Sequence, residues 1–287
     1  MKSYSVYSYL IVFISILTIL YYSNRQDAEE TITYFPIDAS LHFEDAATHL
    51  IPRQDGDYRF ALSWRVSSAL NQKAFLRQDV SLLYKNGRLN GILRDWKQDA
   101  ARLSQVEKYQ EKAASHYQAV TFHYAENHPK ETIFTSAQQL SKDGVYLLTK
   151  PILQYFRNPG SALQTKRKEE MDMKEKELLD RSLNQGLETY NLRKEQYNIL
   201  LLTDLPAGKN SWLSAFPRSQ REEIIGKLWE GLYKNYVLGI KKEDGTVLDP
   251  KGSTIPHLLV AKDASELIVL LRAKDGEPVM LRQRVAR

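Results

Sequence analysis

Strict alternation of large apolar or aromatic residues with smaller or polar ones makes residues 58–67 the clearest element of the chain. One side of the alternation carries Tyr58, Phe60, Leu62, Trp64 and Val66. The other side carries Arg59, Ala61, Ser63, Arg65 and Ser67. Because successive side chains of a strand point to opposite faces, this period of two predicts a half-buried strand. We expect Trp64 to anchor the core rather than to stack on a carbohydrate.

Turn signals divide the region around this strand. Asn86-Gly87 stands between two apolar runs and predicts a β-hairpin, because both central turn residues need positive φ. Further turns are predicted at residues 127–129 and 142–144, and a first strand at residues 32–37.

A helix is predicted between residues 95 and 114. This segment is rich in Ala, Gln, Glu and Lys, and its apolar residues recur at helical spacing: Trp96, Ala100, Leu103 and Val106. The stretch after it alternates again and contains His116 and His123. Their odd separation places the two imidazoles on opposite faces of a strand, so they cannot share a metal ion unless a bulge intervenes.

The pattern changes to a helical one after residue 160. Six residues form one apolar stripe: Leu179, Leu183, Leu187, Tyr190, Tyr197 and Leu201. Acid–base pairs four residues apart support the first turns. The stripe spans too few heptads for a sustained coiled coil, and Pro206 and Gly208 end the predicted helix.

A second helix and then a β meander complete the chain. Residues 219–222 read Ser-Gln-Arg-Glu, a capping box, and the apolar residues after it share a helical face. Two helices joined by a short loop predict a helical hairpin. Four apolar segments around the turn signals Asp244-Gly245 and Asp275-Gly276 predict an antiparallel meander with the helices on its apolar face.

The first segment is uncharged from Val6 to Tyr22. A helix of this length, about 25 Å, is at the short end of what spans a bilayer, and tyrosines at both ends suit the two interfaces. A cleaved secretory signal is the alternative. The absence of a small-residue cleavage site after Tyr22 favours an anchor that is retained.

Positive charges near the segment give a weak orientation signal. Lys2 and the terminal amine precede it, and Arg25 follows it. By the positive-inside rule, the short end lies in the cytoplasm and the long part outside. The absence of cysteine is compatible with an exported domain.

These elements predict an α+β fold. It would comprise an N-terminal transmembrane helix, a β-rich domain with one helix, a helical hairpin and a C-terminal antiparallel β meander. The expected divisions are an anchor at residues 1–25, a linker leading into the domain at 26–57, the β-rich domain at 58–158, and the helix pair with the meander at 159–287. The last two divisions could also form one continuous domain.

Composition narrows the function classes. The chain has 287 residues, a net charge of +5 and no cysteine. Thiol nucleophiles, thiolate zinc sites and redox pairs are therefore excluded. The modest basic surplus would attract an anionic surface but does not predict nucleic-acid binding. No Gly-rich phosphate loop, Gly-x-Ser-x-Gly or His-Glu-x-x-His motif is present, and no cofactor is expected.

Two groups of residues remain as candidate sites. His42, Asp45 and His49 would share a face if that stretch were helical, which makes them the least implausible metal ligands, although a polar surface is the preferred interpretation. The basic residues proposed to contact an anionic surface are Lys166, Arg167, Lys168, Arg282 and Arg284.

The sequence thus favours a single-pass, membrane-anchored extracytoplasmic protein with a non-catalytic binding, assembly or scaffolding role at the cell envelope. Its partners would be the membrane, through residues 6–22, and another envelope protein or an anionic polymer. Two alternatives stay open. One is an envelope hydrolase whose carboxylates and histidines converge only in the fold, and the other is a cytoplasmic domain tethered to the membrane.

Overall fold

The structure is a computed structural model. It describes residues 34–56, 59–130, 132–149, 153–207, 216–241, 246–263 and 265–284. These residues belong to one compact unit, which begins at Thr33. The predicted anchor and the start of the predicted first strand lie outside the described residues. Within them, no helix combines the length and the apolar character needed to cross a bilayer.

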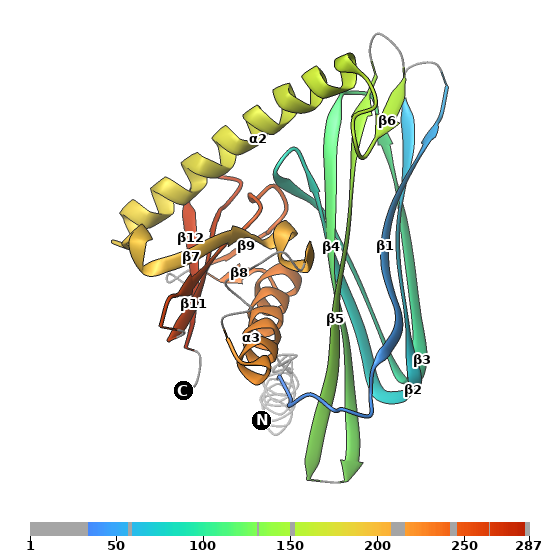
Figure 1. The fold of residues 1–287 in the computed structure, drawn as a ribbon, viewed down its shortest axis with the longest axis vertical. Helices are drawn as coiled ribbons and strands as arrows, with labels where there is room; N and C mark the ends of the chain where they lie inside the picture. The colour runs from blue at the N-terminus through green and yellow to red at the C-terminus, as the bar shows by residue number, and fades with distance from the viewer. Residues whose placement is uncertain are drawn as a thin grey trace, which may run out of the picture. The chain divides into compact units, whose positions relative to one another are not determined.

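A large antiparallel sheet dominates the described chain (Figure 1). Its strands are β1 (Phe43–Gln54), β2 (Phe60–Lys85), β3 (Arg88–Glu111), β4 (Ser115–Lys130), β5 (Ile133–Leu148) and β6 (Gln154–Phe156). The order is β1-β2-β4-β5-β6, and β3 pairs with the other edge of β2. The described chain is mostly β, with few helices and a curled antiparallel sheet.

The long strand β2 has two halves with different neighbours. Its first half, to Ala69, lies between β1 and β3, and its second half, from Ala74, lies between β3 and β4. The register with β3 shifts between Ala69 and Ala74. Such a bulge bends a strand, and β1 consequently contacts β5 as well as β2. The sheet therefore curls, so that its two halves face each other.

The inner faces of the two halves share one core. Its buried members are Leu50, Phe60, Leu62, Trp64, Val66, Leu83, Tyr117, Ala119, Val145 and Leu147. A polar clasp closes the curl at the edge of β1. The backbone N–H of Leu50 donates to Asp143 on β5 at 2.7 Å, and Arg157 donates to the Leu50 carbonyl at 2.9 Å and to Asp143.

The second half of the chain forms a covering layer. It consists of α2 (Ala162–Thr189), a short 3-10 turn (Lys194–Gln196), β7 (Tyr197–Leu201), a second 3-10 segment (Leu202–Ala207), α3 (Arg218–Val237), β8 (Ile240–Lys241), β9 (Val247–Leu248), β10 (His257–Ala261), β11 (Glu266–Arg272) and β12 (Pro278–Arg284). Strands β12-β11-β10-β7 form an antiparallel sheet, and β8 and β9 form a small pair.

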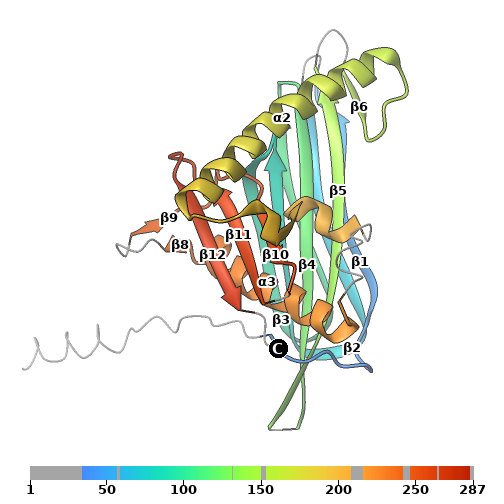
Figure 2. The same cartoon turned by 60° about the vertical axis from the view of Figure 1, so that its left-hand side comes forward.

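Both helices connect this small sheet to the curled sheet, and Figure 2 shows α2 running between them. Gln164, near the start of α2, donates to Gln154 on β6, whereas Gly186, near its end, lies against Leu270 on β11. On α3, Trp229 stacks on Tyr124 of β4 with ring centroids 4.3 Å apart. The covering layer thus packs on the outer face of the second half of β2 and its neighbours.

Several sequence predictions are confirmed. Phe60, Leu62, Trp64 and Val66 are all buried on the first half of β2. Asn86 and Gly87 form the turn between β2 and β3, with φ values of 50° and 79°. Asp275 and Gly276 lie in the turn between β11 and β12, and the last three predicted segments form the antiparallel strands β10, β11 and β12. The first predicted segment, which begins at Tyr236, instead holds the end of α3 and β8, and the fourth strand of this sheet is β7.

The helix predicted at residues 95–114 is wrong, because residues 95–111 belong to β3. Leu103 is buried, but Trp96 and Val106 are 55% and 58% exposed, so the apparent helical stripe does not face a core. β3 pairs with β2 along nearly all of its length. That pairing outweighs the modest helix propensity of the Ala-, Gln- and Lys-rich sequence.

Other predicted boundaries also change. Residues 142–144 continue β5 instead of turning, and residues 127–129 form a register shift before the end of β4. In the described part of residues 32–37, only an isolated bridge from Ile37 to Ser136 forms.

The predicted helical hairpin is replaced by a different connection. α2 ends at Thr189, and the last residues of the predicted stripe form β7, so a strand separates the two helices. α3 begins at Arg218 after Pro217, without a side-chain cap, and not at the capping box. The result is less helical than the predicted α+β arrangement.

Candidate functional site

The outer face of the first half of the sheet is the surface that the covering layer leaves bare. Cross-strand pairing arranges it in five rows from β1 through β2 to β3. The rows are Asp45–Ala69–Arg102, Ala47–Ser67–Ser104, His49–Arg65–Val106, Ile51–Ser63–Lys108 and Arg53–Ala61–Gln110. We call these fifteen residues the outer face.

The outer face is basic. Arg53, Arg65, Arg102 and Lys108 are exposed, and none of them makes an ion pair with another described residue. Its one carboxylate, Asp45, lies in an end row. Burial of the inner residues of the same strands forces these side chains outward, because a strand alternates its faces. The arrangement can attract anions.

A second candidate is a polar network inside the curl. Asp79 accepts a hydrogen bond from Nδ1 of His123 at 2.9 Å, and Nε2 of His123 lies 2.7 Å from the hydroxyl of Ser141. The side chains of Asp79 and His123 are completely buried. An ionised carboxylate can only accept, so we assign the proton to Nδ1. The order carboxylate, imidazole and hydroxyl is that of hydrolase triads.

The network continues beyond Ser141 through hydroxyl groups. Ser141 is 2.6 Å from Thr48, Thr48 is 2.5 Å from Thr121, and Thr121 is 2.6 Å from Ser81. With Nε2 unprotonated, Ser141 donates to His123, Thr48 donates to Ser141 and Thr121 donates to Thr48. The single proton of Ser81 is shared between Thr121 and the carbonyl of Val120. The Ser141 hydroxyl is therefore held by Thr48 of β1 as well as by the imidazole, and the network joins both halves of the sheet.

Arg77 balances the charge of Asp79. The two side chains, both fully buried, form an ion pair of 3.6 Å, and each hydrogen-bonds Ser68, Arg77 at 2.6 Å and Asp79 at 2.5 Å. Arg77 also donates to the carbonyl of Ala101 at 2.5 Å, at the register shift between β2 and β3. Burial lowers the pKa of Arg77, whereas Asp79 raises it. Arg77 therefore has two roles: it balances the charge of Asp79, and it donates a hydrogen bond to the Ala101 carbonyl at the bulge.

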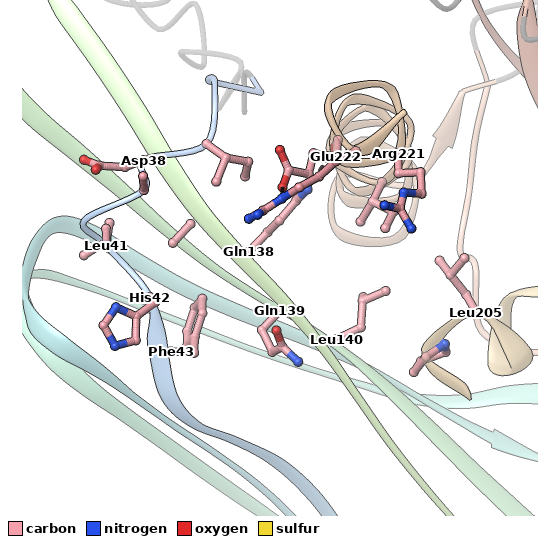
Figure 3. Close-up of a pocket in the computed structure, with 16 residues that line it drawn as sticks. Asp38, Leu41, His42, Phe43, Gln138, Gln139, Leu140, Leu205, Arg221 and Glu222 are labelled. Carbon is pink, nitrogen blue, oxygen red and sulfur yellow. Dashed lines mark hydrogen bonds and ion pairs between the residues drawn. The ribbon is translucent and has the colours of Figure 1, made fainter. Parts of the chain in front are cut away.

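An open cavity of about 620 Å³ lies between β5, α3 and the segment before β1 (Figure 3). Its wall is mixed, with Phe43, Leu140 and Ile225 beside Gln138 and Gln139. In Figure 3, Asp38 and Glu222 stand on different sides of the cavity and do not point toward one another.

Both carboxylates of this cavity have partners. Ser40, Thr135 and Asn127 hydrogen-bond Asp38, and Ser40 in particular lowers the pKa of Asp38 to about 2. Glu222 accepts from Arg218 at 2.7 Å. The pair that acid–base hydrolysis of a glycoside requires, one acid with a raised pKa and one ionised carboxylate, is not formed by these two residues.

A smaller cavity of about 490 Å³ separates α2 from β7 and β10. His257 lines it with 5% of its surface exposed, and its Nδ1 has no hydrogen-bond partner among the described residues. Burial lowers the pKa of His257 to about 4; Asp180 raises it and Lys194 lowers it further. This imidazole is therefore neutral at pH 7.

The three metal candidates are placed apart. Asp45 and His49 lie on β1, and His42 precedes it, so the stretch is a strand and not the helix that would have gathered them. Four residues of a strand cover about 13 Å, too far for Asp45 and His49 to share one ion. Across the described residues, no cluster of three His, Asp or Glu side chains is arranged to hold a metal.

The basic residues predicted to contact an anionic surface occupy two separate places. Lys166, Arg167 and Lys168 lie in the first turns of α2, where Glu170 pairs with Arg167 and Asp172 with Lys168. Arg282 and Arg284 lie at the end of β12, and Glu266 pairs with Arg282 at 3.3 Å. These five residues therefore do not form one patch.

Comparison with known proteins gives little. No family model matches the chain, and no curated protein matches its sequence. Two solved structures of Bacteroides uniformis beta-glucuronidase show a partial likeness, one of them covalently bound to cyclophellitol-6-carboxylate aziridine. For both, the TM-score is 0.25 and the alignment covers 38% of this chain and 14% of that chain, at 14% and 16% identity. A likeness this weak carries no argument.

Sequence reasoning missed the buried network and the outer face. The prediction that His116 and His123 point to opposite faces is confirmed: His116 contacts Glu175 of α2 at 3.0 Å, whereas His123 points to Asp79. The alternation also showed Arg65 on the polar side of its strand. The signal that was lacking is the pairing of β1 and β3 with β2, which gathers the other basic residues beside Arg65.

Proposed function

We propose that this chain is a single-pass, membrane-anchored extracytoplasmic protein with a non-catalytic binding role at the cell envelope, and that the outer face is its binding surface. The uncharged segment at residues 6–22 would be the anchor, in an α+β protein whose described part is the exported domain. Its partner would be another envelope component or an anionic polymer.

The observation that carries this proposal is the contrast between the two candidate sites. The outer face exposes four basic side chains that form no ion pair with a described residue. In the network with the order of a hydrolase triad, Asp79 and His123 are buried, with His123 only 1% exposed, and Ser141 is partly buried. Charges left exposed on an uncovered sheet are available to a partner, whereas charges sealed inside a core are committed to holding it together.

The length of the connecting segment supports a location close to the membrane. Eleven residues separate Tyr22 from Tyr34, the first described residue. Fully extended, a chain of that length reaches at most about 40 Å. A domain on such a tether stays near the bilayer and the polymers attached to it.

Protease treatment of protoplasts tests the topology. The full chain, with an epitope at its C-terminus, should sediment with membranes and lose the epitope to external protease while a cytosolic marker survives. Survival of the epitope would place the domain in the cytoplasm and contradict the orientation. A mature chain that begins after Asn24 and stays soluble would contradict the anchor.

The order of hydrogen bonds in the network favours a second candidate, an envelope hydrolase with Ser141 as nucleophile, His123 as base and Asp79 as the residue that orients it. A fluorophosphonate probe labels activated serines. Under the binding proposal, the wild-type chain is not labelled. Labelling that Ser141→Ala abolishes and Ser67→Ala, on the outer face, leaves intact would establish the hydrolase instead.

A further inference from the structure

We infer that the outer face binds a linear, phosphate-bearing polyanion that lies along the strands. This deepens the proposed function by naming the chemistry of the partner, and it rests on the outer face being the binding surface. The inference follows from the spacing of the four basic side chains, from what surrounds them, and from what the face lacks.

The four cations form a stripe along the strand direction. Arg102 lies in the row of Ala69, Arg65 lies four residues along β2, and Lys108 and Arg53 lie in the next two rows. At about 3.4 Å per residue, the rows from Ala69 to Ala61 span roughly 27 Å. Arg102 and Lys108 lie on β3, Arg65 on β2 and Arg53 on β1. The four cations therefore follow one another along the strand direction although they come from three strands.

This spacing selects a polymer over a small anion. Arg65 and Lys108 are on adjacent strands and adjacent rows, which places their Cα atoms roughly 8 Å apart, and the other neighbouring pairs are farther apart. One phosphate group cannot be held by all four side chains at such separations. A chain with a negative charge at every repeat can meet each cation in turn.

The chemistry of the cations favours phosphate. Three of the four are arginines, whose planar guanidinium groups bind phosphate oxygens with two parallel hydrogen bonds. The hydroxyl of Ser63, between Ile51 and Lys108 in its row, is buried and has no hydrogen-bond partner among the described residues. It is a further polar atom beneath the stripe.

The composition of the outer face disfavours two other anionic partners. None of its fifteen residues is Trp, Tyr or Phe. Proteins that bind single-stranded nucleic acid stack the bases on aromatic side chains. Surfaces that lie on a bilayer use aromatic residues and a broad apolar area at the interface. Small side chains, Ala61, Ser63, Ser67 and Ala69, line β2 instead, so a polymer can lie close to the strand.

The experiment uses the full chain in nanodiscs of phosphatidylcholine, with labelled linear inorganic polyphosphate as the probe. We expect saturable binding that weakens steeply as salt rises, because cations that meet phosphates release counterions. Inorganic phosphate at equal phosphate concentration should compete poorly.

Substitution of the stripe supplies the decisive comparison. Arg53→Gln, Arg65→Gln and Lys108→Gln together should weaken polyphosphate binding by about a hundredfold, since a basic residue near an anionic surface contributes about 1 kcal/mol, or roughly fivefold. The matched control removes the same charge from α2 by Lys166→Gln, Arg167→Gln and Lys168→Gln. It should weaken binding by less than about threefold, because salt screens charges beyond about 8 Å.

Three outcomes would overturn the inference. Equal losses in both triple variants would show that only net charge matters. Equally tight binding of inorganic phosphate would indicate a small-anion site. Protection of Lys108 from amine labelling in phosphatidylglycerol nanodiscs, with none from polyphosphate, would make the membrane the occupant. A cytoplasmic location would contradict the proposed function alone, because polyphosphate binding in nanodiscs does not depend on the topology in the cell.

Discussion

The two halves of β2 belong to one strand and one core, yet their outer faces differ. From Phe60 to Ala69, β2 belongs to the outer face, which is bare and basic. From Ala74 to Lys85, the corresponding side of the strand is covered by the layer that contains α3. The bulge between Ala69 and Ala74 separates them. In this sheet, the exposure of a charged side chain, and not its residue type, therefore decides whether it is available for binding or stabilises the fold.

Two arginines of β2 show the effect of exposure, Arg65 on the bare outer side of the first half and Arg77 inside the curl. Arg65 is exposed and without an ion pair among the described residues, so removing its charge costs the fold little. Arg77 is fully buried and needs Asp79, Ser68 and the carbonyl of Ala101 to compensate for lost hydration. The first arginine is available for binding and the second is structural.

The largest expected effect breaks the buried pair. Asp79→Ala should destabilise the fold by roughly 3–5 kcal/mol, because it leaves the Arg77 guanidinium buried without its counter-charge. Urea denaturation of the full chain in detergent measures the loss. Glu170→Ala, which removes the half-exposed partner of Arg167, is the control and should cost less than about 1 kcal/mol. Equal costs would contradict the structural role given to Asp79.

A double variant sharpens the same prediction. Replacing both charges, by Arg77→Met and Asp79→Leu, should cost less than Asp79→Ala alone, since apolar residues leave no buried charge.

A slightly smaller loss of stability is expected when a side chain of the covering layer is removed, and it should affect other elements than a substitution in the shared core. Trp229→Ala removes a ring that is 3% exposed and stacked on Tyr124, and should cost about 3 kcal/mol. Hydrogen exchange should rise mainly in α3 and β12. Trp64→Ala, in the shared core, should raise exchange in β1 to β5 instead. Identical exchange maps would show that the two regions do not differ in this way.

Acid should weaken the covering layer through His257. Its pKa is about 4 in the folded chain, below the ordinary value of 6.5, because it is buried. The unfolded chain therefore binds the proton first, and stability is complete above pH 6.5 and falls as the pH drops toward 4. The loss is at most about 3 kcal/mol. Between pH 6.5 and 4, the denaturation midpoint should drop less in His257→Phe than in the wild-type chain. If the midpoint of the variant falls with pH as steeply as that of the wild-type chain, His257 is not the group responsible.

The smallest effect concerns the bare face. Arg65→Gln should change the free energy of unfolding by less than about 0.5 kcal/mol, because the side chain is exposed and unpaired. The same urea titration measures it. A loss above about 1 kcal/mol would mean that Arg65 supports the fold, and the contrast with Arg77 would then disappear.

The amino-acid sequence by itself determined the elements whose cause is local. The alternation around Trp64 predicts a strand because one face must be buried, and Asn86-Gly87 predicts a hairpin because both residues tolerate positive φ. The C-terminal strands around Asp275-Gly276 follow for the same reasons. None of these depends on what the rest of the chain does.

Tertiary structure decided the remainder. β3 is polar on most of both faces, so only its partner β2 makes it a strand. Asp79, His123 and Ser141 are 44 and 18 residues apart in sequence, and they meet because the register of β2, β4 and β5 aligns them. The basic stripe likewise depends on which rows three strands share. Pairing between distant strands is set by the packing of the whole sheet, and a slip of one residue would turn every side chain to the other face.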